Sequence, residues 1–235
     1  MFDDAAKGMP CLFKSFCYIL SNFTTARLES NYYIEDLLPD PKTLLTLPLL
    51  SQLSSILHDN ICWEDFKQLH FYKPDSNLAE ATIVANNITS VHGVAVLLVS
   101  GKIVKTGEDA IFGAFIPEPS KDGSNIQPRD EDRDDLFSCF LFELSPVHDV
   151  SWGNVGRPGW SVTGNDELCF GENGNGAALV LGKSLETASL IRNVEQQDPV
   201  FIANAWRGNG SMQLDVEAIE VWAELSPDQD KYEYD

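Results

Sequence analysis

The segment from Leu136 to Leu144 is the feature that most constrains how this chain folds. It holds three Phe, three Leu and one Cys in nine residues, so both faces of an extended segment are mainly apolar. Such a strand must be covered on both sides, which places it inside a sheet. A buried helix is the competing interpretation, but aromatic enrichment and the flanking acidic run and Ser-Pro favour a strand. We expect a strand with two neighbours and with Phe140 and Phe142 buried.

The rest of the chain predicts further short strands with few helices. Strands are expected at 63–72, 93–100, 111–116 and 213–225, a hairpin at 168–182, and helices at 10–20, 42–57 and 77–88. The alternation in 213–225 slips between Ala218 and Ile219, which predicts a β-bulge or a strand covered on both faces. The absence of βαβ alternation indicates antiparallel pairing.

Two glycine-containing segments call for close backbone approach or tight turns. Gly113 stands among large side chains in IFGAFI, which predicts a bulge or the close approach of another backbone. The glycines of 168–182 have a G-x-x-G-x-G spacing, but a phosphate loop needs a helix directly behind them. A strand follows here, and the two Asn-Gly pairs at 173–176 predict a hairpin turn instead.

Composition excludes several classes of partner and compartment. A net charge of -20 argues against binding to nucleic-acid phosphates or to anionic membranes. The five cysteines are scattered and lack Cys-x-x-Cys spacing, which suits a reducing compartment. The N-terminus lacks a secretory pattern, and no stretch reaches the roughly 18 apolar residues of a membrane span. We expect a cytoplasmic, monomeric protein without direct membrane insertion.

No pattern of catalytic or metal-binding residues stands out. There is no G-x-S-x-G, and the four histidines lie in unrelated contexts. His148 and Asp149 could form an acid–base pair, but neighbours on a strand point to opposite faces. No His/Cys pair has zinc-like spacing, and the contiguous acids of 130–135 do not match a calcium loop. We therefore expect no catalytic residues, no metal and no cofactor.

Five short motifs follow one another along the chain: LLVSG at 97–101, FGAF at 112–115, FLFELSP at 140–146, CFG at 169–171 and IEVW at 219–222. In this order they resemble the TLDc family, whose members include oxidation-resistance proteins and fungal restriction-of-telomere-capping proteins. The leucine-rich stretch at 47–57 looks most like the fungal telomere-capping subgroup. The resemblance implies an α+β fold, a two-sheet antiparallel β-sandwich with flanking helices. We expect an N-terminal helical segment at 1–60, the TLDc-like domain at 61–225 and an acidic disordered tail at 226–235.

The resemblance also implies a non-enzymatic role. It suggests a protein-interaction domain that acts in oxidative-stress resistance and binds a protein partner, with subunits of the vacuolar proton ATPase as candidates. Binding to that enzyme would place the protein at the surface of the vacuolar membrane as well as in the cytoplasm. Two alternatives remain: a thiol-dependent antioxidant enzyme, which needs an accessible low-pKa thiolate, and a divergent structural remnant without a partner. The second arises because Glu172 and Asn173 stand where the family has glycines, and because the segment at 181–191 matches poorly.

The candidate partner-binding or structural positions are the motif residues Gly113, Gly171, Glu172, Gly174 and Glu220. Glu220 is the acid of IEVW. We expect it to be partly buried on the face opposite Ile219, held by backbone N–H groups or an Arg. Our hypothesis is that it keeps the glycine turn at 171–176 in shape for a partner.

Overall fold

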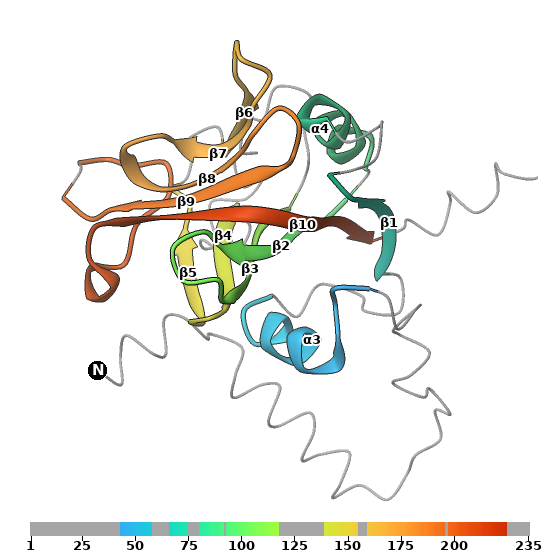
Figure 1. The fold of residues 1–235 in the computed structure, drawn as a ribbon, viewed down its shortest axis with the longest axis horizontal. Helices are drawn as coiled ribbons and strands as arrows, with labels where there is room; N and C mark the ends of the chain where they lie inside the picture. Colours follow the sequence, from blue (N-terminus) through green and yellow to red (C-terminus); the bar gives the residue numbers. More distant parts are fainter. Residues whose placement is uncertain are drawn as a thin grey trace, which may run out of the picture. The chain divides into compact units, whose positions relative to one another are not determined.

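The computed structural model of the chain is drawn in Figure 1. It describes residues 43–57, 66–74, 80–91, 93–117, 139–154, 159–195 and 197–224. The chain separates into two compact units, Met1–Glu64 and Asp65–Asp235. The helix predicted at 10–20 and the tail predicted at 226–235 lie outside the described residues, and so does the acidic run at 130–135.

The described part of the first unit contains one short helix, α3 (Leu47–Ser54). A proline in the first turn needs no intrahelical hydrogen bond, so Pro48 lies in the first turn of the helix and does not split it. Leucines stand four residues apart at 45, 49, 53 and 57 and form a leucine stripe. Leu45, Leu53 and Leu57 are buried, and Leu49 is half-buried. The stripe therefore behaves as core, as the helical spacing predicts.

The second unit is built almost entirely from antiparallel strands (Figure 1). The strands are β1 (Phe66–Tyr72), β2 (Ala95–Ile103), β3 (Asp109–Ile116), β4 (Phe140–Ser145), β5 (Asp149–Trp152), β6 (Trp160–Val162), β7 (Leu168–Glu172), β8 (Asn175–Leu181), β9 (Thr187–Asn193) and β10 (Gly210–Glu224). The helical elements are α4 (Ala81–Ser90) and the 3-10 helix η2 (Ala205–Arg207). The fold is thus β-rich and antiparallel with few helices, as predicted.

Hydrogen bonding joins all ten strands into one sheet. The order is β5-β4-β3-β2-β10-β9-β8-β7-β6, and β1 pairs with β10 off this path. The long strand β10 holds the sheet together, because β9 and β2 pair with its first part and β2 and β1 with its second. Its register against β2 shifts between Val216 and Ala218. The predicted bulge is therefore present, close to the expected position.

The apolar segment that anchors the sequence analysis forms β4, which lies between β3 and β5. Phe140 and Phe142 on one face are each 2% exposed, and Leu141 on the other face is 1% exposed, which confirms that the strand is covered on both sides. The ring of Phe140 lies 4.7 Å from that of Phe115 and 4.8 Å from that of Trp152, measured between centroids. The alternate side chains, such as Leu141, belong to the main core with α4. Residues 136–138 of the predicted strand lie outside the described residues.

Replacing Phe140 with alanine should destabilise the fold by about 3–5 kcal/mol, because the cavity would lie between two aromatic rings. Denaturant unfolding would measure the loss. Phe71→Ala is the matched control, since Phe71 is 45% exposed on β1 and its truncation should change stability little. Equal midpoints for both variants would contradict the assignment of Phe140 to the core.

Candidate functional site: a buried ion cluster and the loops around it

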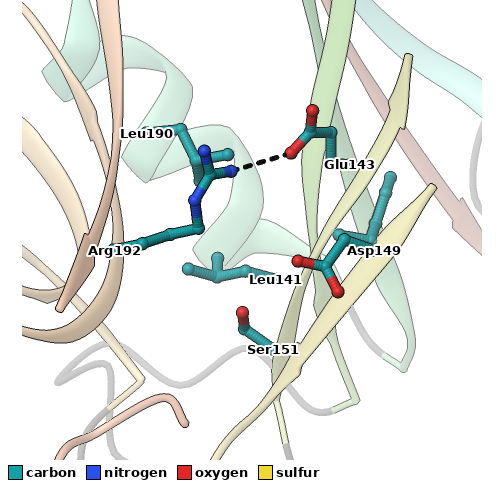
Figure 2. A pocket seen from close by; sticks show the side chains of 7 residues that line it. Leu141, Glu143, Asp149, Ser151, Leu190 and Arg192 are labelled. Carbon is teal, nitrogen blue, oxygen red and sulfur yellow. Dashed lines mark hydrogen bonds and ion pairs between the residues drawn. The ribbon is translucent and has the colours of Figure 1, made fainter. Parts of the chain in front are cut away.

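A buried carboxylate, Glu143 on β4, forms ion pairs with two guanidinium groups. Its Oε2 accepts hydrogen bonds from Nη1 of Arg192 at 3.1 Å and from Nη2 of Arg207 at 2.7 Å. Figure 2 shows Arg192 reaching from β9 to Glu143. Strands β4 and β9 are separated in the sheet order by β3, β2 and β10. The ion pair is therefore a contact that only the folded sheet creates.

A second carboxylate extends this cluster. Asp149 on β5 lies 3.6 Å from Nε of Arg207, measured at Oδ2. Its Oδ1 accepts a hydrogen bond of 2.7 Å from Nδ2 of Asn204, which also donates to the carbonyl oxygen of Val150. Two acids face two arginines, so the buried charges balance. Buried charges are tolerable only when they are paired in this way.

Burial governs the electrostatics of the cluster. Loss of hydration raises the pKa of the Glu143 carboxyl above its ordinary value, and the charges of Arg207 and Arg192 oppose that rise. Burial likewise lowers the pKa of the Arg192 guanidinium, and the neighbouring charge of Arg207 adds to the effect. An arginine nevertheless stays protonated in proteins, so the cluster keeps both positive charges.

A small cavity of about 10 Å³ adjoins the cluster. Its lining residues are Leu141, Phe142, Glu143, Asp149, Ser151, Leu190 and Arg192 (Figure 2). Glu143 Oε1 and Arg192 Nε are buried here without a hydrogen-bond partner in the described part of the chain. The volume matches about one water molecule, which could satisfy both atoms, and it leaves no room for an organic substrate.

Metal-binding groups and membrane-spanning helices are both absent from the described ranges. Within them, no three His, Cys, Asp or Glu side chains gather in a way that could hold a metal ion. None of the helices described is long and apolar enough to cross a membrane.

The two described cysteines are buried. Cys139 is 1% exposed and Cys169 is 7% exposed. Burial raises the pKa of both thiols, and the charge of Glu167 adds to the effect at Cys169. A reactive thiol needs the opposite shift together with access to solvent. Cys11, Cys17 and Cys62 lie outside the described residues.

Three of the five predicted site residues come together on the β7–β8 hairpin. Gly171 has φ +84°, and a Cβ there would lie 2.9 Å from the ring of Phe201. Gly174 also has a positive φ, 86°, but faces open space. Glu172 is exposed, and its Oε2 accepts a hydrogen bond of 2.9 Å from Nδ2 of Asn175. The first Asn-Gly pair, Asn173 and Gly174, forms the predicted turn, and the second pair, Asn175 and Gly176, begins β8.

The other two predicted residues lie across the sheet from the hairpin strands. Leu98 on β2 pairs with Glu220 on one side and with Gly113 on the other, so these residues share a cross-strand row. A Cβ on Gly113 would collide with the ring of Phe142 and the carbonyl oxygen of Leu97. The predicted close approach at Gly113 is therefore confirmed.

Glu220 is 0% exposed, and its Oε2 accepts a hydrogen bond of 2.8 Å from the indole Nε1 of Trp222. The burial predicted for Glu220 is confirmed and is complete, and the indole N–H of Trp222 is a donor that the sequence did not indicate. The contacts at the glycine turn come from Phe201 and Pro199, which pack against Gly171 and Gly176. The role proposed for Glu220 in shaping that turn stays a prediction.

Sequence reasoning missed the ion cluster. Its members are Glu143, Asp149, Arg192, Asn204 and Arg207. One signal was available: Glu143 is the single charged residue within the most apolar strand, and a charge at such a position requires a partner. Its two arginine partners come from β9 and from the loop before β10, far along the chain, and nothing in their local sequence marks them.

The site belongs to an antiparallel β domain with a buried ion cluster and a cavity of about one water molecule. The family model for the TLDc domain matches residues 38–224. This chain is therefore a member of the TLDc domain family, which confirms the resemblance carried by the five motifs. Restriction of telomere capping protein 5 from Emericella nidulans is 25% identical over 205 residues. The match covers 75% of this chain and 30% of that relative.

Arg207→Met should cost about 3–5 kcal/mol, because it leaves two buried carboxylates short of their shared cation. Urea unfolding would measure the loss. Lys183→Met is the matched control: Lys183 pairs with Asp166 at 2.7 Å, but its side chain is 61% exposed, so its loss should change stability little. Similar losses in the two variants would show that the cluster is no stronger than a surface pair.

The raised pKa of Glu143 predicts a pH dependence of stability. Between the ordinary carboxyl pKa and the raised folded value, the folded protein binds more protons than the unfolded chain. The contribution of Glu143 to stability is therefore fully present below that window and falls as pH rises through it. Glu143→Gln should remove this decline in a series of melting curves, and Arg207→Met should extend it to higher pH. An unchanged pH profile in both variants would contradict the assignment.

Glu220→Leu should cost about 1–3 kcal/mol, since the buried indole N–H of Trp222 loses its oxygen acceptor. A double-mutant cycle with Trp222→Phe isolates the coupling between the two side chains. Gln213→Leu is the control on the same strand, because Gln213 is exposed. Additive losses in the cycle would mean that the hydrogen bond contributes no stability.

Proposed function

We propose that this chain is a non-enzymatic, protein-binding TLDc domain that associates with the vacuolar proton ATPase and contributes to resistance against oxidative stress. The observation that carries the proposal is the family match over residues 38–224. Partner and stress role come from the resemblance to the family. The relative's printed name refers to telomere capping, and this chain spans 30% of its length, so that role is not transferred.

The chemistry of the described residues supports a binding role. The two carboxylates of the ion cluster are neutralised by Arg192 and Arg207, which leaves neither as a general base poised for a substrate. The adjoining cavity accommodates about one water molecule. These features favour a binding domain over an enzyme. Its surface would bind a protein partner in the cytoplasm and at the vacuolar membrane.

We further interpret the ten-stranded sheet as one that folds over at β10 into the two layers of a sandwich. The ion pair between Glu143 on β4 and Arg192 on β9 supports this interpretation, because three strands separate β4 from β9 along the sheet. The bulge between Val216 and Ala218 supplies extra twist within β10, at the boundary between its two sets of partners.

Association with the proton ATPase is tested with the tagged full chain and the purified soluble sector of that enzyme. We expect retention of the sector above the background of an unrelated protein of similar negative charge. The Phe140→Ala variant, which should be destabilised by about 3–5 kcal/mol, is the internal control for binding that depends on structure. Retention equal to that of the charge-matched protein would contradict the proposed association.

The alternative of a thiol-dependent antioxidant enzyme makes a different prediction. Buried thiols with raised pKa react slowly, so a native chain with Cys11, Cys17 and Cys62 changed to Ser should label slowly at Cys139 and Cys169. Cells carrying a fully cysteine-free chain should survive peroxide as well as cells carrying the natural one. Rapid labelling of either thiol at neutral pH, or lost protection, would favour the enzyme.

A further inference from the structure

The loop that joins β9 to β10, residues 194–209, presents two large apolar side chains to solvent. Trp206 is 57% exposed and Ile202 is 48% exposed. Trp206 has the highest exposed fraction among the large apolar side chains of the described ranges. An exposed aromatic residue on a loop is typical of a binding site, since Trp is enriched where interfaces gain most of their binding energy.

Buried neighbours and backbone hydrogen bonds of the loop keep these side chains exposed. Phe201 and Ala203 are buried on either side of Ile202, so the chain alternates between core and solvent. The Ile202 amide donates to the carbonyl oxygen of Trp152 at 2.8 Å, and Asn204 is held by Asp149 and Val150. These contacts fix the backbone immediately before Trp206. A side chain held in this way loses little conformational entropy on binding.

The residue after Trp206, Arg207, belongs to the ion cluster and holds the loop through it. The guanidinium carbon of Arg207 lies 5.3 Å from the centre of the Trp206 ring, within cation–π range. The same guanidinium donates to Glu143 at 2.7 Å. The buried carboxylates thus hold Arg207, and Arg207 holds one face of the exposed ring. A buried charge cluster and an exposed aromatic ring are in this way parts of one arrangement.

The exposed charges next to the loop are acidic. Glu195 and Asp198 lie in the loop itself, and Glu172 lies on the hairpin whose Gly171 and Gly176 pack against Phe201 and Pro199. The nearby cations, Arg192 and Arg207, are already engaged by the buried acids. We define the Trp206 surface as Ile202, Trp206, Glu172 and Glu195.

We propose that the Trp206 surface binds a basic, amphipathic segment of a partner protein, with an apolar side chain against Trp206 and Ile202 and Lys or Arg beside the acids. The proposal rests on the proposed interaction function and assigns its surface. A net charge of -20 opposes docking of a second copy, and it equally opposes nucleic acids and anionic membranes. Complementary charge on a protein segment fits the same observation.

The test uses the full chain and three labelled peptides of equal length, measured by fluorescence anisotropy. One peptide alternates Lys and Leu, one alternates Glu and Leu, and one alternates Lys and Ser. We expect only the Lys-Leu peptide to bind, and we expect Trp206→Ala to weaken that binding at least about tenfold. Phe71→Ala is the matched control, because it removes another exposed aromatic residue and should leave the affinity unchanged.

Three results would overturn the proposal: binding of the Glu-Leu peptide as tight as that of the Lys-Leu peptide, equal losses in Trp206→Ala and Phe71→Ala, or no binding of any peptide up to about 1 mM. Self-association of the chain that Trp206→Ala abolishes would also overturn it, with a second copy as the occupant. Retention of the proton ATPase sector is a separate readout. Retention that Trp206→Ala leaves intact would refute this surface and keep the proposed function, whereas peptide binding without retention would do the reverse.

Discussion

The buried carboxylate of Glu143 is the constraint on which much of the domain depends. A charge in the interior must be compensated, and here the two compensating arginines come from β9 and from the loop before β10. Satisfying one side chain therefore fixes how two parts of the sheet, far apart in strand order, meet each other. The cost of leaving Glu143 unpaired penalises any arrangement in which β4 and β9 are apart.

The same cluster connects the interior to the surface. Arg207 contacts Glu143 and Asp149 inside the domain and the ring of Trp206 outside it. The buried ion pairs of Arg207 therefore hold the loop in place, although its backbone belongs to no long helix or strand. The glycine hairpin joins this arrangement through Phe201, which packs against Gly171 and is completely buried. The hairpin and the Trp206 loop are consequently packed against each other through Phe201.

Strand β10 plays the corresponding role for the backbone. It is the longest strand, and its bulge separates a first part, residues 213–217, which alternate between exposed and buried positions, from a second part, residues 218–223, which are all buried. The change explains why one face of the first part accepts charged residues such as Asp215 and Glu217, whereas Glu220 in the second part must be buried and hydrogen-bonded. A single strand thus serves two environments, and the bulge marks the change between them.

The sequence by itself determined the features that depend on neighbouring residues. Apolar runs and Asn-Gly turns identified β4 and the β7–β8 hairpin, and the phase slip at Ala218 located the bulge within two residues. It missed β5, β6 and β9, which are short or carry polar residues among the apolar ones, so that their strand character comes from pairing. Only the tertiary structure decided the pairing of Glu143 with Arg192 and Arg207, because an ion pair depends on distance in space and not along the chain. For the same reason the exposure of Trp206 could not be foreseen: a tryptophan in a loop packs inward or outward according to what holds its backbone.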